Sequence, residues 1–211
     1  LDELFAAYEE ASGISVDRDR FHWWLVMCTL KWGIGCMGQA SVHLTGAVRS
    51  VELAAIGRRV CEQEWDLLEL LAPDQWRRAG AEAPPDEAPD EPGLHGRPTA
   101  PELLQAAREF VSGEAMGSTT GRLQFLLRVT SNVLATVERQ WRLGPAQEAR
   151  FAAGLAGLGA SSAAGLAGMI RSGAFDGRED ELHPFLAASV RDRLAVANPG
   201  RIVPAGGATT G

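Results

Sequence analysis

The sequence predicts an all-α protein: two helical bundles joined by an acidic, proline-rich linker. Three observations support this fold class. Apolar residues recur at steps of three and four along most of the chain, no alternating strand pattern bounded by hairpin signals appears, and the composition changes sharply over residues 74–97. The expected organisation is a first domain over 1–73, a disordered linker over 74–97, a second domain over 98–200 and a tail over 201–211.

Three helices are expected in the first domain. Residues 2–12 form a short helix that ends at Gly13, since glycine takes the left-handed conformation at little cost. Asp17 is the expected cap of a second helix. Apolar residues cover most of its circumference, so we expect this helix to be buried on most sides. A third helix is expected over residues 50–71, ahead of Pro73.

Amino-acid composition distinguishes the predicted linker from the second domain. AEAPPDEAPDEPG combines prolines with acidic residues and offers almost nothing that a core would bury. Order is expected to return at Thr99, where T-A-P-E has the form of a capping box with Glu102. The expected helices are 101–112, 119–143 ended by Gly144 and Pro145, two short Ala/Gly-rich helices around 151–158 and 166–170 with Ser161 and Ser162 as candidate caps, and 180–197.

The overall composition excludes some partners. The 211 residues carry a formal net charge of -7 and are 45% hydrophobic, which suits one or two globular domains. Nucleic acid binding draws on clustered Lys and Arg, so we expect no nucleic acid partner. Cys28, Cys36 and Cys61 show no CxxC spacing and are predicted to be reduced and buried, with no zinc site and no disulfide.

Residues LDELFAAYEEASG lack the basic segment and apolar stretch of a secretory signal, so we expect a cytoplasmic protein. The apolar residues 21–48 raise the alternative of a membrane span. Lys31 lies in the middle of that stretch, where a lysine is costly in a bilayer. A buried helix of a soluble protein, with no membrane partner, is therefore favoured.

Gly33, Gly35 and Gly38 match the dinucleotide-binding pattern G-x-G-x-x-G. That motif needs a second strand soon after its helix, ending in an acidic residue, but another long amphipathic helix follows here. Close packing between helices explains the three glycines better.

No catalytic residue is predicted. Phosphoryl transfer needs phosphate clamps and metal-binding carboxylates, yet the only lysine, Lys31, stands in LKWG and not in a G-K-[ST] motif. No histidine is followed by the Asp and Asn of a kinase catalytic loop, and no serine lies in a G-x-S-x-G elbow. We therefore expect this chain to bind no cofactor and no metal.

Two polar groupings are candidate sites. His43, Arg49 and Glu52 cluster near the turn between the second and third helices, and together with Trp32 they are candidates for a substrate pocket. Helix capping and surface ion pairing are the competing interpretation. The candidates for partner binding on the long helix are Arg128, Asn132 and Glu138, and a solvated face is the alternative there.

The segments YEEASG and LKWGIGCMGQASVHLTGAVRSVELAAIGRRVCEQEWDLLELL resemble the C-terminal helical part of the aminoglycoside phosphotransferase or choline kinase-like family. The resemblance covers residues 1–72. It implies helices on the substrate side of a kinase cleft, without the ATP-binding lobe and catalytic loop that precede them in the family. ATP and Mg²⁺ are implied only for a complete family member. Residues 97–200 resemble an uncharacterised bacterial helical domain found beside or fused to such kinases.

The leading hypothesis is a non-catalytic kinase fragment, inactive alone, whose accessory domain binds a protein partner: the kinase lobe or a second copy. One alternative is half of a split, active ATP-dependent phosphotransferase whose nucleotide lobe an upstream polypeptide supplies. Another is a small-molecule-binding bundle with Trp23, Trp24 and Trp32 around a pocket. Because three helices alone leave apolar surface uncovered, we expect the first domain to pack on the second or to self-associate.

Overall fold

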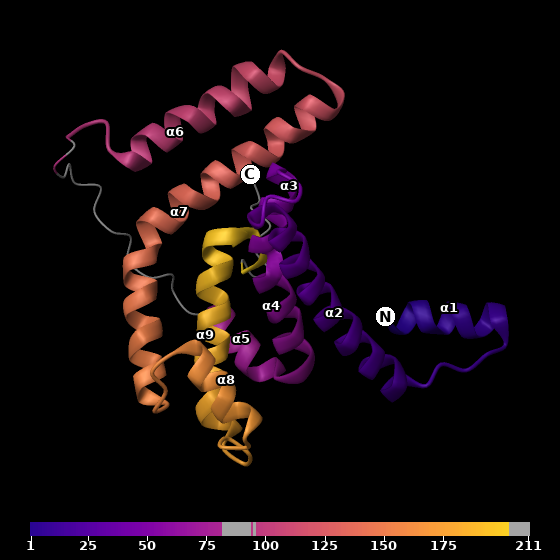
Figure 1. The fold of residues 1–211 in the computed structure, drawn as a ribbon. Coiled ribbons are helices and arrows are strands. Elements are labelled where there is room, and N and C mark those ends of the chain that lie inside the picture. The colour runs from indigo at the N-terminus through magenta and orange to yellow at the C-terminus, as the bar shows by residue number, and fades with distance from the viewer. Residues whose placement is uncertain (82–93, 95, 203–211) are drawn as a thin grey trace.

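The computed structural model describes residues 1–81, 94 and 96–202 (Figure 1). The predicted all-α class is confirmed, and no strand occurs in these residues. None of the helices described is both long and apolar enough to span a bilayer. The helices are α1 Asp2–Ser12, α2 Arg18–Leu44, α3 Val51–Ile56, α4 Val60–Leu71, α5 Pro73–Ala81, α6 Ala100–Phe110, α7 Gly121–Gly157, α8 Ala163–Arg171 and α9 Glu179–Ala197.

Several predicted helix starts have the expected caps. The Asp17 carboxylate accepts a hydrogen bond from the Arg20 amide at 3.0 Å and begins α2. The capping box is present as well: the Thr99 amide donates to Glu102 at 2.6 Å, and the Glu102 amide donates to the Thr99 hydroxyl at 3.4 Å. Ser162 caps α8 by accepting from the Gly165 amide. Local side-chain chemistry therefore sets these boundaries.

The two halves of the chain share one hydrophobic core. Its buried members come from α4, α5 and α9: Cys61, Trp65, Ala79, Ala187, Val190 and Leu194. In Figure 1, α9 lies between α4 on one side and α7 on the other. Contact between the halves was one of the two predicted outcomes, and it is present. The prediction of two separate bundles is not confirmed, because the helix that completes the first half's core belongs to the second.

The first residues of the predicted linker are helical instead. Residues 73–81, of which all but the first were assigned to the linker, form helix α5, with Pro73 at its first position where a missing amide donor costs nothing. Trp76 of α5 lies edge to face with Trp65 of α4, with ring centroids 5.7 Å apart, and packs on the shared core. The remainder of the predicted linker, 82–93 and 95, and the predicted tail from residue 203 lie outside the described residues.

Helix α7 is much longer than predicted. It was expected to end at Gly144 and Pro145, but it continues through both to Gly157 and includes the expected 151–158 helix. A proline inside a helix removes one hydrogen bond and bends the axis, and α7 changes direction along its course (Figure 1). Leu143 and Gly144 are buried, so packing of this region stabilises the continuous helix against the cost of the proline.

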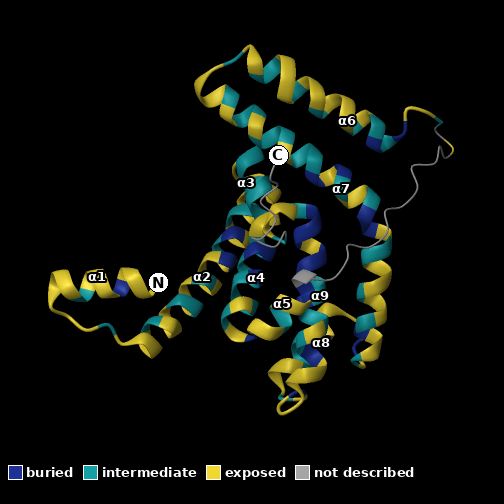
Figure 2. Cartoon of the chain, turned by 180° about the vertical axis from the view of Figure 1, so that it is seen from behind, coloured by how far each residue is buried: buried dark blue, intermediate teal, exposed yellow. Residues whose placement is uncertain are grey.

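The prediction that α2 is buried on most sides is wrong. Only Gly33 and Cys36 of its 27 residues are buried, and much of the helix is exposed where it leaves the body of the protein (Figure 2). Cys28, predicted to be buried, is exposed, whereas Cys36 and Cys61 are buried and free as expected. Close packing between helices accounts for Gly33, one of the three motif glycines, since a Cβ there would lie 3.4 Å from the Gln63 Cβ of α4.

Candidate functional site

A cleft of about 810 Å³ lies where the two halves of the chain meet. One wall is formed by α3, the 3₁₀ turn Gly57–Arg59 and the start of α4, and the facing wall is one side of α7. The C-terminal end of α9 and the 3₁₀ turn Pro199–Arg201 close one end. We call this hollow the central cleft. Its walls come from segments that are far apart in the sequence.

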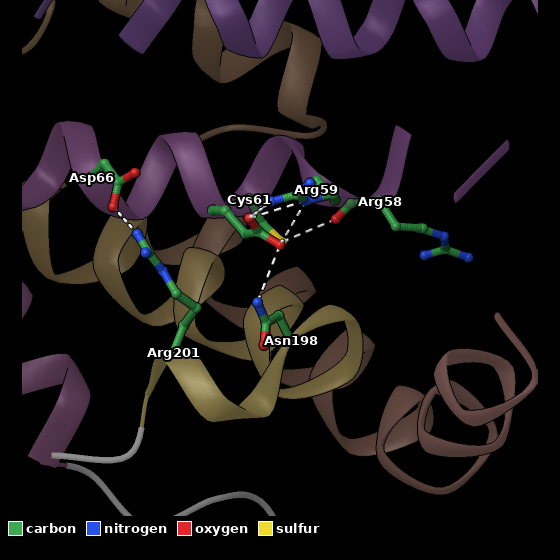
Figure 3. A network of polar contacts seen from close by, with 7 residues as sticks. Arg58, Arg59, Cys61, Asp66, Asn198 and Arg201 are labelled. Atoms are coloured by element: carbon green, nitrogen blue, oxygen red, sulfur yellow. Dashed lines mark hydrogen bonds and ion pairs between the residues drawn. The ribbon is translucent and has the colours of Figure 1, made fainter. Parts of the chain in front are cut away.

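A hydrogen-bonded network fixes the end of the cleft beside α9 (Figure 3). Arg59 donates to the Glu62 carboxylate from two nitrogens, at 3.0 and 3.2 Å, and the Asn198 amide donates to the same carboxylate at 3.2 Å. The hydrogen bond to Glu62 raises the pKa of the Arg59 guanidinium. Glu62 is 7% exposed and has charged and neutral donors, so it serves to hold the walls together.

Two other arginines line the central cleft without a carboxylate partner in the described chain. Arg58 donates to the neutral side chain of Gln140 at 2.5 Å. Arg139 donates to the Val196 carbonyl at 2.7 Å and to the Thr136 hydroxyl at 3.3 Å. Burial lowers the pKa of the Arg139 guanidinium, which means that its environment disfavours the charge. The Glu138 carboxylate offsets part of the charge of Arg139, but neither Arg58 nor Arg139 has an ion pair among the described residues.

The other end of the central cleft is more apolar. Phe125, Val129 and Val133 follow each other at four-residue steps on α7, and Ile56 of α3 lies among the same lining residues. The Glu52 carboxylate at this end pairs with Arg122 of α7 at 3.1 Å. Each of the two carboxylates that line the cleft, Glu62 at one end and Glu52 at the other, therefore already has an arginine partner.

The structure does not bring the predicted substrate-pocket residues together. His43 Nδ1 accepts a hydrogen bond from the Ser50 amide at 3.0 Å, which ties the turn after α2, and exposed Arg49 lies against Gly46. Trp32 is eleven residues before His43 on the same helix, a separation of about 16 Å along the axis. Of the four candidates, only Glu52 lines the central cleft.

The predicted partner-binding stripe on α7 is also divided. Arg128 and Asn132 are exposed, and Asn132 lines the central cleft. Glu138 is 8% exposed and pairs with Arg108 of α6 at 3.1 Å and with Arg142 at 3.5 Å. Its carboxylate therefore anchors α6 to α7 and is not available to an incoming partner.

Three residues that line the central cleft are not predicted as site residues from the sequence: Arg58, Arg139 and Asn198. The one available signal is the Arg58–Arg59 pair in the middle of the amphipathic helix expected over 50–71. Asn198 was assigned only as a helix stop, and its hydrogen bond to Glu62 spans 136 positions, which no local pattern reveals.

A second surface lies on the outer side of α2. Five large apolar residues alternate at steps of four and three along it and form what we call the α2 stripe: Trp23, Met27, Leu30, Ile34 and Met37. Each is between 40% and 61% exposed. Trp24 packs edge to face on Trp23 at a centroid distance of 4.7 Å. Neither Trp23, Trp24 nor Trp32 lines the central cleft, so the cleft differs from the predicted tryptophan pocket.

Within the described part of the chain, no group of three or more His, Cys, Asp or Glu side chains is placed to hold a metal ion. The carboxylates of the central cleft point to arginines instead.

Comparison with protein families matches residues 117–201 to a family described as a domain of unknown function (DUF6285). The matched segment contains α7, α8 and α9, and agrees with the resemblance of residues 97–200 to an uncharacterised helical domain. It gives no support for the phosphotransferase resemblance of residues 1–72. No curated protein and no solved structure matches the chain.

Proposed function

We propose that this chain is a non-catalytic docking module that binds a helical face of a phosphotransferase-like partner protein through the α2 stripe. The observation that carries the proposal is the stripe itself. Exposed apolar residues scattered singly are ordinary on a protein surface, but five in one continuous row favour an interaction site.

The spacing of the α2 stripe favours a helix as the contacting element. Steps of four and three residues repeat every seven positions, which is the pattern of a helix that packs along another helix. From Trp23 to Met37 the row extends about 21 Å along the axis. That length matches several turns of a partner helix.

A neighbouring side of α2, about 100° around the helix from the stripe, is held by the body of the protein. Cys36 is fully buried, and a Cβ at Gly57 would lie 2.6 Å from the Ala40 Cβ, so the two backbones approach closely. Phe5 of α1 packs edge to face on Phe21 at a centroid distance of 4.8 Å near the other end. A helix fixed in this way presents its outer side in a defined orientation, which reduces the entropy cost of docking.

The identity of the partner rests on the resemblance of residues 1–72 to the substrate-side helices of a phosphotransferase. In the family these helices complete the substrate side of a cleft whose other side carries the nucleotide lobe, and we assign the α2 stripe to the contact with that lobe. Whether the assembly is active separates a split enzyme from a non-catalytic module. A phosphotransfer assay with ATP and Mg²⁺ on the chain with and without the upstream-encoded polypeptide distinguishes them, because only a split enzyme gains turnover on mixing.

The docking test uses the double variant Leu30→Glu/Ile34→Glu. Both side chains are exposed, so we expect a folded protein with the helix content of the wild type. Mixing with the polypeptide encoded upstream of this chain, followed by size-exclusion chromatography with light scattering, should give a complex for the wild type and none for the variant. Leu123→Glu, at an exposed position on α7, is the matched control and should leave the complex intact.

Two outcomes would contradict the proposal. Absence of a complex with wild-type chain would reject this partner. A wild-type homodimer that the double variant abolishes would reassign the α2 stripe to self-association.

A further inference from the structure

We propose that the central cleft binds an amphipathic organic anion, with its acidic head group between Arg58 and Arg139 and its apolar body along Ile56, Phe125, Val129 and Val133. This surface is separate from the α2 stripe, so the inference does not depend on the docking function.

At the head-group end, two guanidiniums have only neutral hydrogen-bond acceptors. Arg58 makes its hydrogen bond to the neutral Gln140, and Arg139 donates to a carbonyl and a hydroxyl, so neither guanidinium has an ion pair among the described residues. Arg58, in the 3₁₀ turn Gly57–Arg59, and Arg139, on α7, both line the central cleft, one from each of its facing walls. A carboxylate or phosphate held by both guanidiniums would gain charge-assisted hydrogen bonds.

Charge within the cleft favours an added anion. The lining contains three arginines, Arg58, Arg59 and Arg139, and two carboxylates. Glu62 is engaged by Arg59 and Asn198, and Glu52 is engaged by Arg122, which stands outside the lining. The cleft therefore carries a net positive charge although the chain as a whole has a net charge of -7.

The body of the ligand is defined by the apolar end. Phe125, Val129 and Val133 cover about 12 Å along α7, and Ile56 faces the same space from α3. An inorganic anion would leave this row uncovered, and a purely apolar molecule would leave the two arginines unpaired. A medium-length hydrocarbon chain ending in a carboxylate or phosphate monoester satisfies both ends.

The test is isothermal titration calorimetry of the full chain with three probes that share an eight-carbon chain: octanoate, octyl phosphate and neutral octanamide. We expect at least one of the two anions to bind about tenfold or more tightly than octanamide, since the head group makes charge-assisted hydrogen bonds. The stronger of the two anions then identifies the head-group class.

Matched variants locate the site. Arg58→Gln should weaken binding of the anion about tenfold, because it removes one guanidinium from an exposed position without disturbing the core. Arg128→Gln removes an exposed arginine from α7 that does not line the cleft and should leave affinity unchanged. The Leu30→Glu/Ile34→Glu variant should also bind normally, which separates this inference from the docking proposal.

The inference is overturned if neither anion binds the wild type or if octanamide binds as tightly as the anions. Equal affinities of the Arg58→Gln and Arg128→Gln variants would overturn it as well.

Discussion

The side-chain amide of Asn198 donates a hydrogen bond to the Glu62 carboxylate, 3.2 Å away and 136 positions earlier in the chain. Asn198 ends α9, within the segment that matches the family of unknown function, whereas Glu62 belongs to α4, outside that segment. Arg201 and Asp66 form an ion pair between the same two regions. The matched segment is therefore joined to preceding helices by polar contacts, one partly buried and one exposed, as well as by the shared core.

Loss of the Glu62 carboxylate should destabilise the protein. Glu62→Ala removes a buried carboxylate that accepts hydrogen bonds from exposed Arg59 and from Asn198, so we expect the free energy of unfolding to fall by about 1 to 3 kcal/mol. Urea denaturation measures the change. Glu69→Ala, at an exposed position on the same helix, should stay within about 0.5 kcal/mol of the wild type, and equal losses for both variants would contradict the structural role of Glu62.

The shared core predicts that a cavity in α9 loosens the first half of the chain. Leu194 is fully buried against α4 and α5, so Leu194→Ala should cost about 2 to 5 kcal/mol. Five of the six tryptophans precede residue 82, and tryptophan fluorescence during unfolding therefore reports mainly on the first half. We expect the fluorescence and circular dichroism transitions to shift together.

An independent first bundle would behave differently. Its fluorescence transition would stay at the wild-type urea concentration in the Leu194→Ala variant. Leu123→Ala, at an exposed position on α7, is the control that should move neither transition.

Local signals predicted the start of most elements, and non-local contacts determined what those elements pack against. Asp17 and Thr99 cap helices where the sequence places them, because a cap depends on neighbours within three residues. Trp76 was missed as a core residue because it stands in a polar window and is recruited by Trp65 of another helix. Pro145 was assigned as a helix end, since the burial of Leu143 and Gly144 is invisible to a local rule.

Helix α2 shows the reverse error, a helix that was predicted to be buried and is largely exposed. A helix that is apolar on most sides predicts burial, and one side of α2 does pack on the body of the protein around Gly33 and Cys36. The pattern cannot tell a side covered by the same chain from a side left for another molecule. For the same reason the cleft residues Arg58 and Arg139 are not predicted, since their placement depends on how the segment from α3 to the 3₁₀ turn Gly57–Arg59 meets α7.

Glycine substitutions should distinguish packed from open positions on either side of α2. A Cβ at Gly57 would lie 2.6 Å from the Ala40 Cβ, so Gly57→Ala forces α2 away from its support and should cost about 1 to 3 kcal/mol. Gly38, in the same region of α2, has no atom within 4 Å of an added Cβ among the described residues. Gly38→Ala should therefore stabilise the helix by up to about 1 kcal/mol. Thermal unfolding measures both, and a costly Gly38→Ala would contradict the assigned packing.

The two buried thiols should make stability depend on alkaline pH. Burial raises the pKa of the Cys61 thiol from 9.0 to about 11, so the folded protein holds this proton after the unfolded chain has released it. Its contribution is fully present below about pH 9 and is lost as pH rises toward 11, amounting to at most about 3 kcal/mol. Burial also raises the pKa of Cys36, whereas Cys28 is exposed.

Urea denaturation between about pH 8 and pH 11 tests this dependence. Cys61→Ala should be less stable than the wild type at neutral pH, because it loses packing in the shared core, but its stability should fall less steeply as pH rises. Cys28→Ala removes an exposed thiol and should keep the wild-type slope. If all three proteins lost stability at the same rate over this range, the Cys61 thiol would not be the titrating group, and its place between α4 and α9 would need revision.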